Sequence, residues 1–340
     1  MTTHQTHLLT VENVDKHFDI SGGFLDQLAF KGGVHLEKTT VKAVNNVSLF
    51  VNKGETLSVV GESGCGKSTL ARVILGLYRP NAGKVIYDGQ RIDHLSHEQW
   101  LPYRRKMQMI FQDPYASLNP RKTVRQTLEE PLRFHNPKMT AQEAVDKVAY
   151  VMEQVGVDPG WIGRYPHEFS GGQRQRISIA RGLILDPDFI VADEPVSALD
   201  VSIQAQILNL LMDLREKHDL TYLFITHDLS VVRHISSRVA VLYLGTVCEL
   251  ASANDLFESP RHPYTRALLS AIPKVGEKKA KHIKLKGEVP TPVNLPSGCV
   301  FHGRCVYARD RCRKEFPPLN ELPNGSFVSC HGVEEGWDLN

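Results

Sequence analysis

A glycine-rich segment, Gly61–Ser68, constrains the fold of this chain more than any other part of it. Its sequence, GESGCGKS, fits the pattern G-x-x-x-x-G-K-[ST]. An apolar strand is predicted before it at Thr56–Val60, and an apolar stripe of helical spacing follows between Leu70 and Leu77. Strand, glycine-rich turn and helix predict an α/β fold with a parallel sheet, in which the turn wraps backbone N–H groups around phosphates.

The residue types of this loop indicate which side chains would meet a nucleotide. We expect Lys67 to reach the β- and γ-phosphates and the Ser68 hydroxyl to ligate Mg²⁺. Cys65 is interpreted as a contributor of backbone rather than as a nucleophile. The predicted ATP-binding residues of the segment are Gly61, Glu62, Ser63, Gly64, Cys65, Gly66, Lys67, Ser68 and Thr69.

A second α/β pattern lies later in the chain. A buried strand, Phe189–Asp193, delivers Asp193 to its exposed end, where the carboxylate can hold the Mg²⁺ shell. Glu194 follows directly and is placed to polarise an attacking water as general base. A strand at 221–226 and a hairpin at 238–248, turning near Gly245, complete the pattern. Residues 120–185 carry helical periodicity and predict a helical subdomain inserted into the sheet domain.

Composition excludes several classes of protein. The chain has 340 residues, enough for about two domains, and its net charge of +2 argues against a dedicated nucleic-acid binder. No apolar run approaches the roughly 20 residues of a membrane span, and the first residues, MTTHQTHLL, lack the basic and apolar regions of a signal peptide. We therefore expect a cytoplasmic protein that reaches a membrane only through another polypeptide.

Further motifs stand in order along the chain: Phe18 in NVDKHF, Gln112 in MIFQDP, SGGQ at 170–173, SALD at 197–200 and His227 in FITHD. With the phosphate loop and the acidic pair, they resemble the ATP-binding-cassette (ABC) ATPases over about residues 8–272. Phe169 stands where the family consensus has Leu. The resemblance implies a RecA-like core with an antiparallel β subdomain and the inserted helical subdomain. Phe18 then stacks on adenine, although an aromatic residue near a strand end is also typical of a core.

The resemblance also implies roles for residues outside the phosphate loop. Gln112, Glu194 and His227 are the implied catalytic residues, and Mg²⁺ is held through Ser68, Gln112 and Asp193. Two cassettes close on two ATP molecules, and each completes the site of the other. The residues implied to bind ATP in this way, across a dimer, are Ser170, Gly171, Gly172, Gln173 and Asp200.

The segment PRHPYTRALLSAIPK at 260–274, followed by a cysteine-rich end, resembles the oligopeptide and dipeptide importer ATPases, and the F-type subunit most. This resemblance implies a peripheral position on the cytoplasmic face of the inner membrane. The implied partners are a second, different ABC ATPase, two membrane permeases and an external substrate-binding protein, with no nucleic acid. We divide the chain into an ATP-binding domain (1–272), with its helical subdomain at about 120–185, a linker (273–298) and an extension (299–340).

The extension carries four cysteines: Cys299, Cys305, Cys312 and Cys330. Four thiolates can hold Zn²⁺ or a [4Fe–4S] cluster, and the absence of paired C-x₂-C knuckles favours the cluster, which related importer ATPases carry at this place. His302 and His331 are alternative ligands. The remaining possibility is four unliganded thiols. We expect the role of the cluster to be structural, since nothing in the sequence places it beside the ATP site.

Two other functions compete with peptide import. A soluble ABC ATPase acting on nucleic acid or ribosomes usually has a long coiled coil or two cassettes in one chain, and this chain has one cassette. Alternatively, the imported solute is nickel or an oligosaccharide, because the permeases and the binding protein choose the solute and this chain encodes neither.

Overall fold

A computed structural model of the chain describes residues 7–20, 39–272, 283–285, 287, 290–293 and 295–339. The chain forms two compact units: unit 1 comprises residues 1–8, 51–59 and 94–237, and unit 2 comprises 9–50, 60–93 and 238–340. Most of the linker predicted at 273–298 lies outside the described residues.

Unit 1 contains strands that are neighbours in one sheet. In sheet order they are β3 (Thr56–Val60), β8 (Thr221–Thr226), β7 (Phe189–Asp193) and β6 (Met107–Ile110). Strand β7 pairs in parallel with both β6 and β8. Every residue of β7 and β8 is buried, as in a parallel sheet that is covered on both faces. The predicted strands at 56–60, 189–193 and 221–226 are therefore confirmed.

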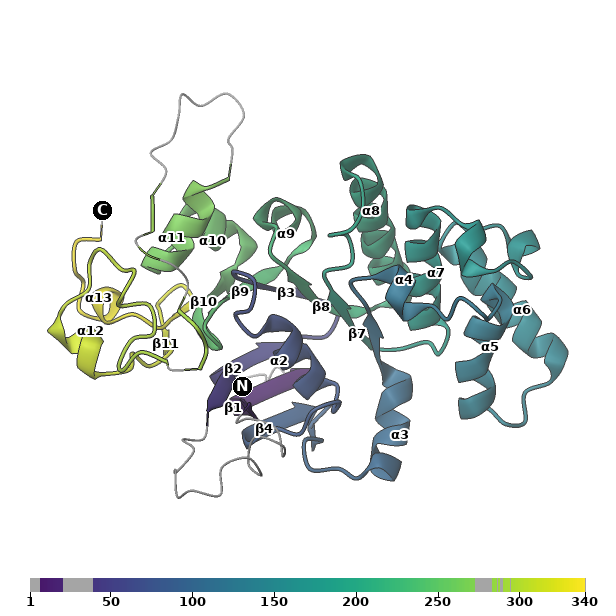
Figure 1. Ribbon diagram of the computed structural model, residues 1–340, viewed down its shortest axis with the longest axis horizontal. Helices are drawn as coiled ribbons and strands as arrows, with labels where there is room; N and C mark the ends of the chain where they lie inside the picture. Colours follow the sequence, from purple (N-terminus) through teal and green to yellow (C-terminus); the bar gives the residue numbers. More distant parts are fainter. Residues whose placement is uncertain are drawn as a thin grey trace, which may run out of the picture. The chain divides into compact units, whose positions relative to one another are not determined.

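The helices of unit 1 are α3 (His97–Lys106), α4 (Pro114–Ser117), α5 (Val124–His135), α6 (Ala141–Gln154), α7 (Gly171–Leu183), α8 (Val201–His218) and α9 (Leu229–Ile235). Short 3₁₀ turns lie at Pro159–Trp161 and Pro166–Glu168. Helices α5, α6 and α7 pack against one another (Figure 1). Each of the three begins at a capping box, in which the N-cap and third-residue side chains bond each other's backbone N–H groups. Local sequence thus determines where these helices begin.

Unit 2 contains an antiparallel sheet and the helix that follows the phosphate loop. The sheet order is β2 (Thr40–Val51), β1 (Leu9–Asp19), β4 (Ala82–Tyr87) and β5 (Gln90–Arg91). Helix α2 (Lys67–Ile74) is shorter than its apolar stripe predicts. The chain leaves the helix at Leu75, and Gly76 takes a φ of +64°, so that Leu77 is 47% exposed and the predicted stripe is wrong at its last residue.

The predicted hairpin is present in unit 2 as β9 (Arg238–Tyr243) and β10 (Thr246–Ser252). Its two turn residues, Leu244 and Gly245, have φ values of +44° and +78°, as the commonest two-residue hairpin turn requires. Helices α10 (Ala253–Glu258) and α11 (Pro263–Ser270) follow it.

The C-terminal extension is attached to this hairpin by backbone pairing. It contains α12 (Asp310–Lys314), β11 (Asn320–Glu321), β12 (Phe327–Val328) and α13 (His331–Glu334), drawn in yellow in Figure 1. Strand β12 pairs antiparallel with β10, and β11 pairs with β12. The extension thus adds its two short strands to the edge of the sheet that contains the hairpin.

Candidate active site

The phosphate-loop segment folds tightly between β3 and α2. Gly61 and Gly66 have φ values of +154° and +102°. A Cβ on Gly61 would stand 2.2 Å from the carbonyl oxygen of Leu242, and one on Gly66 would stand 2.0 Å from the carbonyl oxygen of Ala43. Any side chain at either position would collide with backbone, so close packing of unit 2 around the loop requires both glycines.

Lys67 is buried within the loop that it follows. Its Nζ donates hydrogen bonds to the carbonyl oxygens of Gly61 (2.8 Å) and Glu62 (3.0 Å). It also lies 3.8 Å from the Sγ of Cys65, and burial raises the pKa of that thiol. The ammonium group therefore stands inside the curve of the loop, with the buried Cys65 beside it. The part of Cys65 in ATP binding, through its backbone, stays a prediction.

Phe18, the candidate adenine-stacking residue, lies in unit 2 with a second aromatic residue. The ring centroids of Phe18 and Tyr78 are 5.3 Å apart in an edge-to-face arrangement, and the Nζ of Lys16 lies 5.1 Å from the Phe18 ring. Tyr78 is not identified as a candidate by the sequence, because Tyr78 belongs to none of the motifs found there.

In unit 1 the structure brings together the three residues that the sequence names as catalytic. Glu194 accepts a hydrogen bond at Oε2 from Gln112 Nε2 (2.9 Å), and its Oε1 lies 3.1 Å from His227 Nδ1. The Glu194 side chain is 16% exposed and that of His227 is 57% exposed. One carboxylate is thus oriented by two side chains and remains accessible at the surface of the unit.

The topology of the sheet explains this convergence. Gln112, Glu194 and His227 follow β6, β7 and β8, which are adjacent and parallel, so their carboxyl ends lie at one edge. Asp193, the last residue of β7, is buried at the same edge. The sheet edge therefore brings these side chains together, although they are more than 30 positions apart in the sequence.

The backbone at Glu194 is held in an unusual conformation. Its φ is +47°, in the left-handed region that costs a non-glycine residue about 1–3 kcal/mol. The Glu194 N–H donates to the carbonyl of Ile225 (2.9 Å), and the Glu194 carbonyl accepts from the Ser197 hydroxyl (3.1 Å). Such strain persists where neighbours determine the conformation, and here it sets the direction of the carboxylate.

The SGGQ segment forms the start of helix α7. The Ser170 hydroxyl accepts from the Gln173 N–H (3.3 Å), and the Gln173 side chain accepts from the Ser170 N–H (3.0 Å). Ser170 is exposed, whereas Phe169 is buried against Trp161. Phe in place of Leu thus keeps an apolar anchor before the helix. Asp200 is exposed at the N-cap of α8 and makes no capping hydrogen bond there.

The four cysteines of the extension line one pocket in unit 2, together with His302 and His331. Burial raises the pKa of Cys299 to about 12 and that of Cys305 to about 11, and it also raises the pKa of Cys330. Within the described residues, however, no group of three or more His, Cys, Asp or Glu side chains is arranged to hold a metal ion. The structure brings the predicted ligands together without displaying a formed metal site.

Of the two histidines considered as substitute ligands, His331 has both ring nitrogens engaged. Its Nε2 bonds the carbonyl of Glu315 (3.0 Å), and its Nδ1 lies 3.4 Å from the Glu334 carboxylate. His302 Nδ1 bonds the carbonyl of Cys299 (2.9 Å). His331 is therefore a support of the pocket rather than a substitute ligand.

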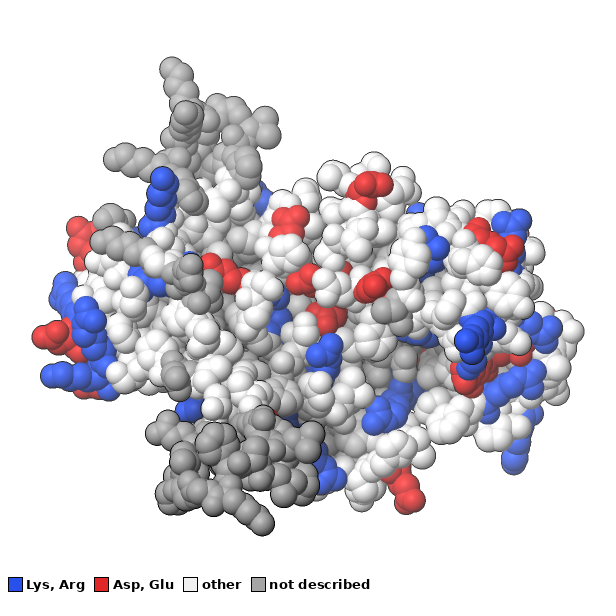
Figure 2. Space-filling model, viewed as in Figure 1, with Lys and Arg blue, Asp and Glu red and all other residues white. Residues whose placement is uncertain are grey.

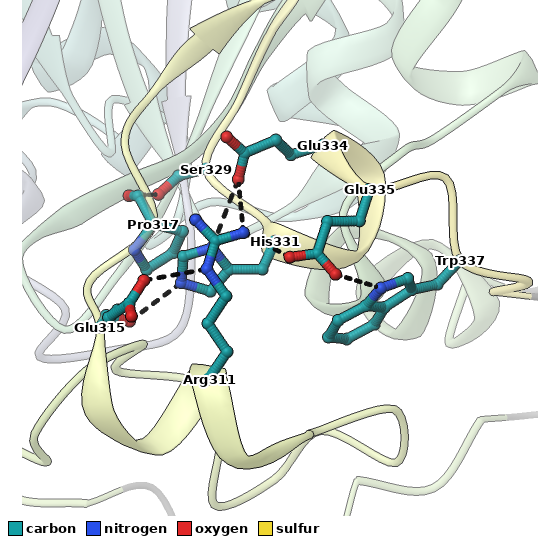
Figure 3. A network of polar contacts seen from close by, with 8 residues as sticks. All are labelled: Arg311, Glu315, Pro317, Ser329, His331, Glu334, Glu335 and Trp337. Carbon is teal, nitrogen blue, oxygen red and sulfur yellow. Dashed lines mark hydrogen bonds and ion pairs between the residues drawn. The ribbon is translucent and has the colours of Figure 1, made fainter.

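A polar network holds the walls of this cysteine pocket (Figure 3). Arg311 on α12 pairs with Glu315 (2.9 Å), Glu334 (3.3 Å) and Glu335. It connects α12, which carries Cys312, with α13, which begins beside Cys330. The Ser329 hydroxyl donates to the carbonyl of Pro317 (2.7 Å). This bond holds the end of β12, which Ser329 directly follows.

The structure also shows a contact that sequence reasoning missed. Arg304, in the extension, pairs with Glu62 in the phosphate loop: Nη1 lies 2.7 Å from Oε2 and Nη2 lies 3.2 Å from Oε1. The two residues are 242 positions apart. The sequence alone does not place the extension beside the ATP-binding residues, whereas the structure brings this arginine of the extension to Glu62.

Charged side chains are mixed on the face seen in Figure 2, where Lys and Arg alternate with Asp and Glu. Across the described part of the chain, no helix is long and apolar enough to cross a membrane.

Comparison with known families gives two matches. Residues 44–197 match the family described as "ABC transporter", and residues 248–312 match "Oligopeptide/dipeptide transporter, C-terminal region". The oligopeptide transport ATP-binding protein AppF of Bacillus subtilis is 52% identical over 96% of this chain and 98% of its own length. OppF of Escherichia coli is 50% identical over 96% of both chains, and the dipeptide transport protein DppF of Haemophilus influenzae is 49% identical over 89% of this chain and 93% of its own.

Solved structures agree with the fold. The ATP-binding cassette MJ0796, in a dimeric post-hydrolysis state bound to ADP and Pi, matches with a TM-score of 0.61 and 30% identity, over 72% of this chain and 98% of its own. CbiO1 of Clostridium perfringens matches with a TM-score of 0.62 at 24% identity, over 74% and 91% of the two chains. The predicted fold class, an ABC ATPase cassette, is confirmed.

Proposed function

This chain belongs to the ATP-binding subunits of oligopeptide and dipeptide ABC transporters, and we propose that it binds and hydrolyses ATP to power peptide import. One observation carries the catalytic part of the proposal: the Glu194 carboxylate is held by Gln112 and His227 at the carboxyl edge of a parallel sheet. A carboxylate so placed can accept the proton of an attacking water.

The phosphate loop supplies the nucleotide side of the proposed site. The residues Gly61 to Thr69 bind the phosphates, with Lys67 as the cation of the loop and Ser68 as a ligand of Mg²⁺. Gln112 and Asp193 complete the Mg²⁺ shell, and Phe18, with Tyr78 beside it, meets the adenine ring. This assignment is supported by the tight glycine packing of the loop and by the buried position of Lys67.

A second cassette completes the site. Ser170, Gly171, Gly172, Gln173 and Asp200 meet the ATP bound by the partner, and the exposed start of α7 supports this role. ATP can close such a dimer only because it binds the closed state more tightly than the open one. The partner we propose is a different ABC ATPase, so a monomeric preparation should hydrolyse ATP far more slowly per site than the full complex.

The membrane partners follow from the family. Two permeases carry the peptide, an external binding protein delivers it, and this chain sits peripherally on the cytoplasmic face of the membrane. The relatives named for oligopeptide and dipeptide transport support a peptide rather than nickel or an oligosaccharide. We keep the domain division at 1–272, 273–298 and 299–340, with the helical subdomain at about 120–185.

Peptide uptake by the reconstituted complex tests this function. Proteoliposomes that contain both ATPases and both permeases should take up labelled di- and oligopeptides when ATP and the binding protein are supplied. The Lys67→Ala complex should take up far less. Uptake of nickel or oligosaccharide in place of every peptide, or peptide uptake that needs no ATP, would contradict the proposal.

The extension is the proposed site of a [4Fe–4S] cluster. Four thiols from separate segments line one pocket, and thiolates are the ligands that iron–sulfur clusters use. Cys299, Cys305, Cys312 and Cys330 would hold the cluster once their protons are released, which makes its binding dependent on pH. Bound in this way, the cluster would supply folding free energy to a segment that has little apolar core of its own.

Metal analysis separates the cluster from its alternatives. Anaerobically purified protein should contain roughly four irons and acid-labile sulfide per chain. Cys305→Ser should lose them and expose the extension to protease, while Cys65→Ala, a substitution outside the pocket, should keep them. Stoichiometric zinc without iron would instead assign a Cys₄ zinc site. A metal-free extension that resists protease would show that the four thiols hold no metal.

A further inference from the structure

The ion pair between Glu62 and Arg304 connects the phosphate loop directly to the C-terminal extension. It is bidentate, and the Arg304 side chain is only 9% exposed while that of Glu62 is 24% exposed. Two parallel hydrogen bonds between a guanidinium and a carboxylate fix the orientation of both groups, and solvent screens them little at this burial. The Glu62 side chain therefore has a defined position in the loop.

The backbone at Glu62 is held as well. Its N–H donates to the Tyr264 hydroxyl (3.1 Å), and its carbonyl accepts from Lys67 Nζ (3.0 Å). Tyr264 packs against Tyr243 at 4.7 Å between ring centroids, and the Arg304 guanidinium lies 5.8 Å from the Tyr243 ring. The second residue of the loop is thus fixed by α11, by β9 and by the extension.

The charge of Glu62 would affect nucleotide binding if Arg304 did not pair with it. Nearby cations raise the affinity of a phosphate-binding loop for its ligand, and nearby anions lower it. Glu62 places a carboxylate among the residues of this loop. The Arg304 guanidinium neutralises that carboxylate and turns it toward the extension. Without Arg304, an unpaired carboxylate would remain in a loop that has to accept several negative charges.

We propose that Arg304 is a positioning residue of the ATP site: it holds Glu62 and offsets its charge, so that the cysteine-rich extension sets the affinity of the phosphate loop for nucleotide. This inference rests on the proposed ATP-binding function of the loop. Arg304 stands in a turn whose N–H groups at Arg304 and Cys305 both donate to the carbonyl of Phe301 (3.0 and 3.1 Å). The turn that presents the guanidinium therefore also places a wall of the cysteine pocket.

A double-mutant cycle on the full-length chain tests the inference through the equilibrium Kd for a fluorescent ATP analogue. Arg304→Met should raise Kd about tenfold, because it leaves the Glu62 charge unpaired. Glu62→Gln alone, which removes the charge and keeps the backbone contacts of the loop, should raise Kd less than Arg304→Met does. The double variant should bind more tightly than Arg304→Met alone, and a full tenfold rescue would correspond to a coupling of about 1.4 kcal/mol.

The control is Arg313→Met, which removes an exposed arginine from the same extension and should leave Kd unchanged. A purely structural role of Arg304 would lower Tm, and adding Glu62→Gln would not restore Kd. That result, or wild-type affinity in Arg304→Met, would overturn the inference. If Arg304→Met does not fold, Arg304→Gln, which removes the charge and keeps a polar side chain, takes its place in the cycle. A folded wild type that binds no ATP would instead refute the proposed function itself.

Discussion

Replacing Glu194 with Gln removes the proposed general base while keeping the shape of the side chain. In the structure, Oε2 accepts from Gln112 Nε2 at 2.9 Å and Oε1 lies 3.1 Å from His227 Nδ1. The amide of a glutamine can accept from Gln112 with its oxygen and donate to an unprotonated Nδ1 with its nitrogen. The substitution therefore preserves both contacts, and the loss of rate measures the loss of basicity.

The expected loss is large compared with the loss of one supporting contact. Removal of a general base costs on the order of 10²–10⁴ in rate, about 3–5 kcal/mol. His227→Ala removes one hydrogen bond to a charged group, which is worth about 1.5–3 kcal/mol, or roughly 10- to 150-fold. Glu194→Gln should therefore be the slower of the two variants, with ATP binding retained in both.

Phosphate release by the assembled complex is the assay, with the partner ATPase inactivated at its own phosphate-loop lysine so that only one site is counted. Glu216→Gln, on the exposed face of α8, is the matched control and should hydrolyse ATP at the wild-type rate. Near wild-type turnover in Glu194→Gln would refute the general-base assignment. A loss equal to that of His227→Ala would show that the carboxylate only orients a neighbour.

Three further substitutions test other parts of the site. Lys67→Ala should weaken ATP binding at least tenfold in an equilibrium titration and strongly reduce transport, because the loop loses its buried cation. Unchanged uptake would refute its role. Gly66→Ala should abolish ATP binding and lower Tm, since its Cβ would stand 2.0 Å from a backbone oxygen. Gly64→Ala meets no neighbouring atom but has a φ of +78°, so it should lower Tm less than Gly66→Ala does. Ser170→Ala should lower stability by about 1 kcal/mol in denaturant titration through loss of the cap, while Ser170→Thr should retain it.

The parts of the fold that the sequence predicts well are those fixed by local chemistry. The apolar runs at 189–193 and 221–226 are short and rich in β-branched and aromatic residues, which favours buried strands over helices. The capping box of Ser170 and Gln173 marks a helix start within four residues. The convergence of Gln112, Glu194 and His227 is also predictable, because carboxyl ends of neighbouring parallel strands share one edge.

The parts that the sequence does not predict depend on long-range packing. Leu77 continues the apolar period of α2, yet Gly76 turns the chain away first. Nothing near Arg304 distinguishes it from the other arginines of the extension, and its partner lies 242 positions earlier. The role of Tyr78 cannot be predicted from the sequence for the same reason, because only the folded unit places its ring beside Phe18.

The attachment of the extension to unit 2 argues against treating it as a separable appendage. Strand β12 extends the β9–β10 hairpin, Phe301 packs on Tyr243 and Tyr264 with ring centroids 5.3 and 5.4 Å apart, and Arg304 reaches Glu62. The first contact is backbone pairing, the second is aromatic packing and the third is an ion pair. Because the same hairpin also closes on the phosphate loop, through the hydrogen bond from the Gly245 N–H to the Cys65 carbonyl (2.9 Å), a change in the extension has a short physical path to the nucleotide.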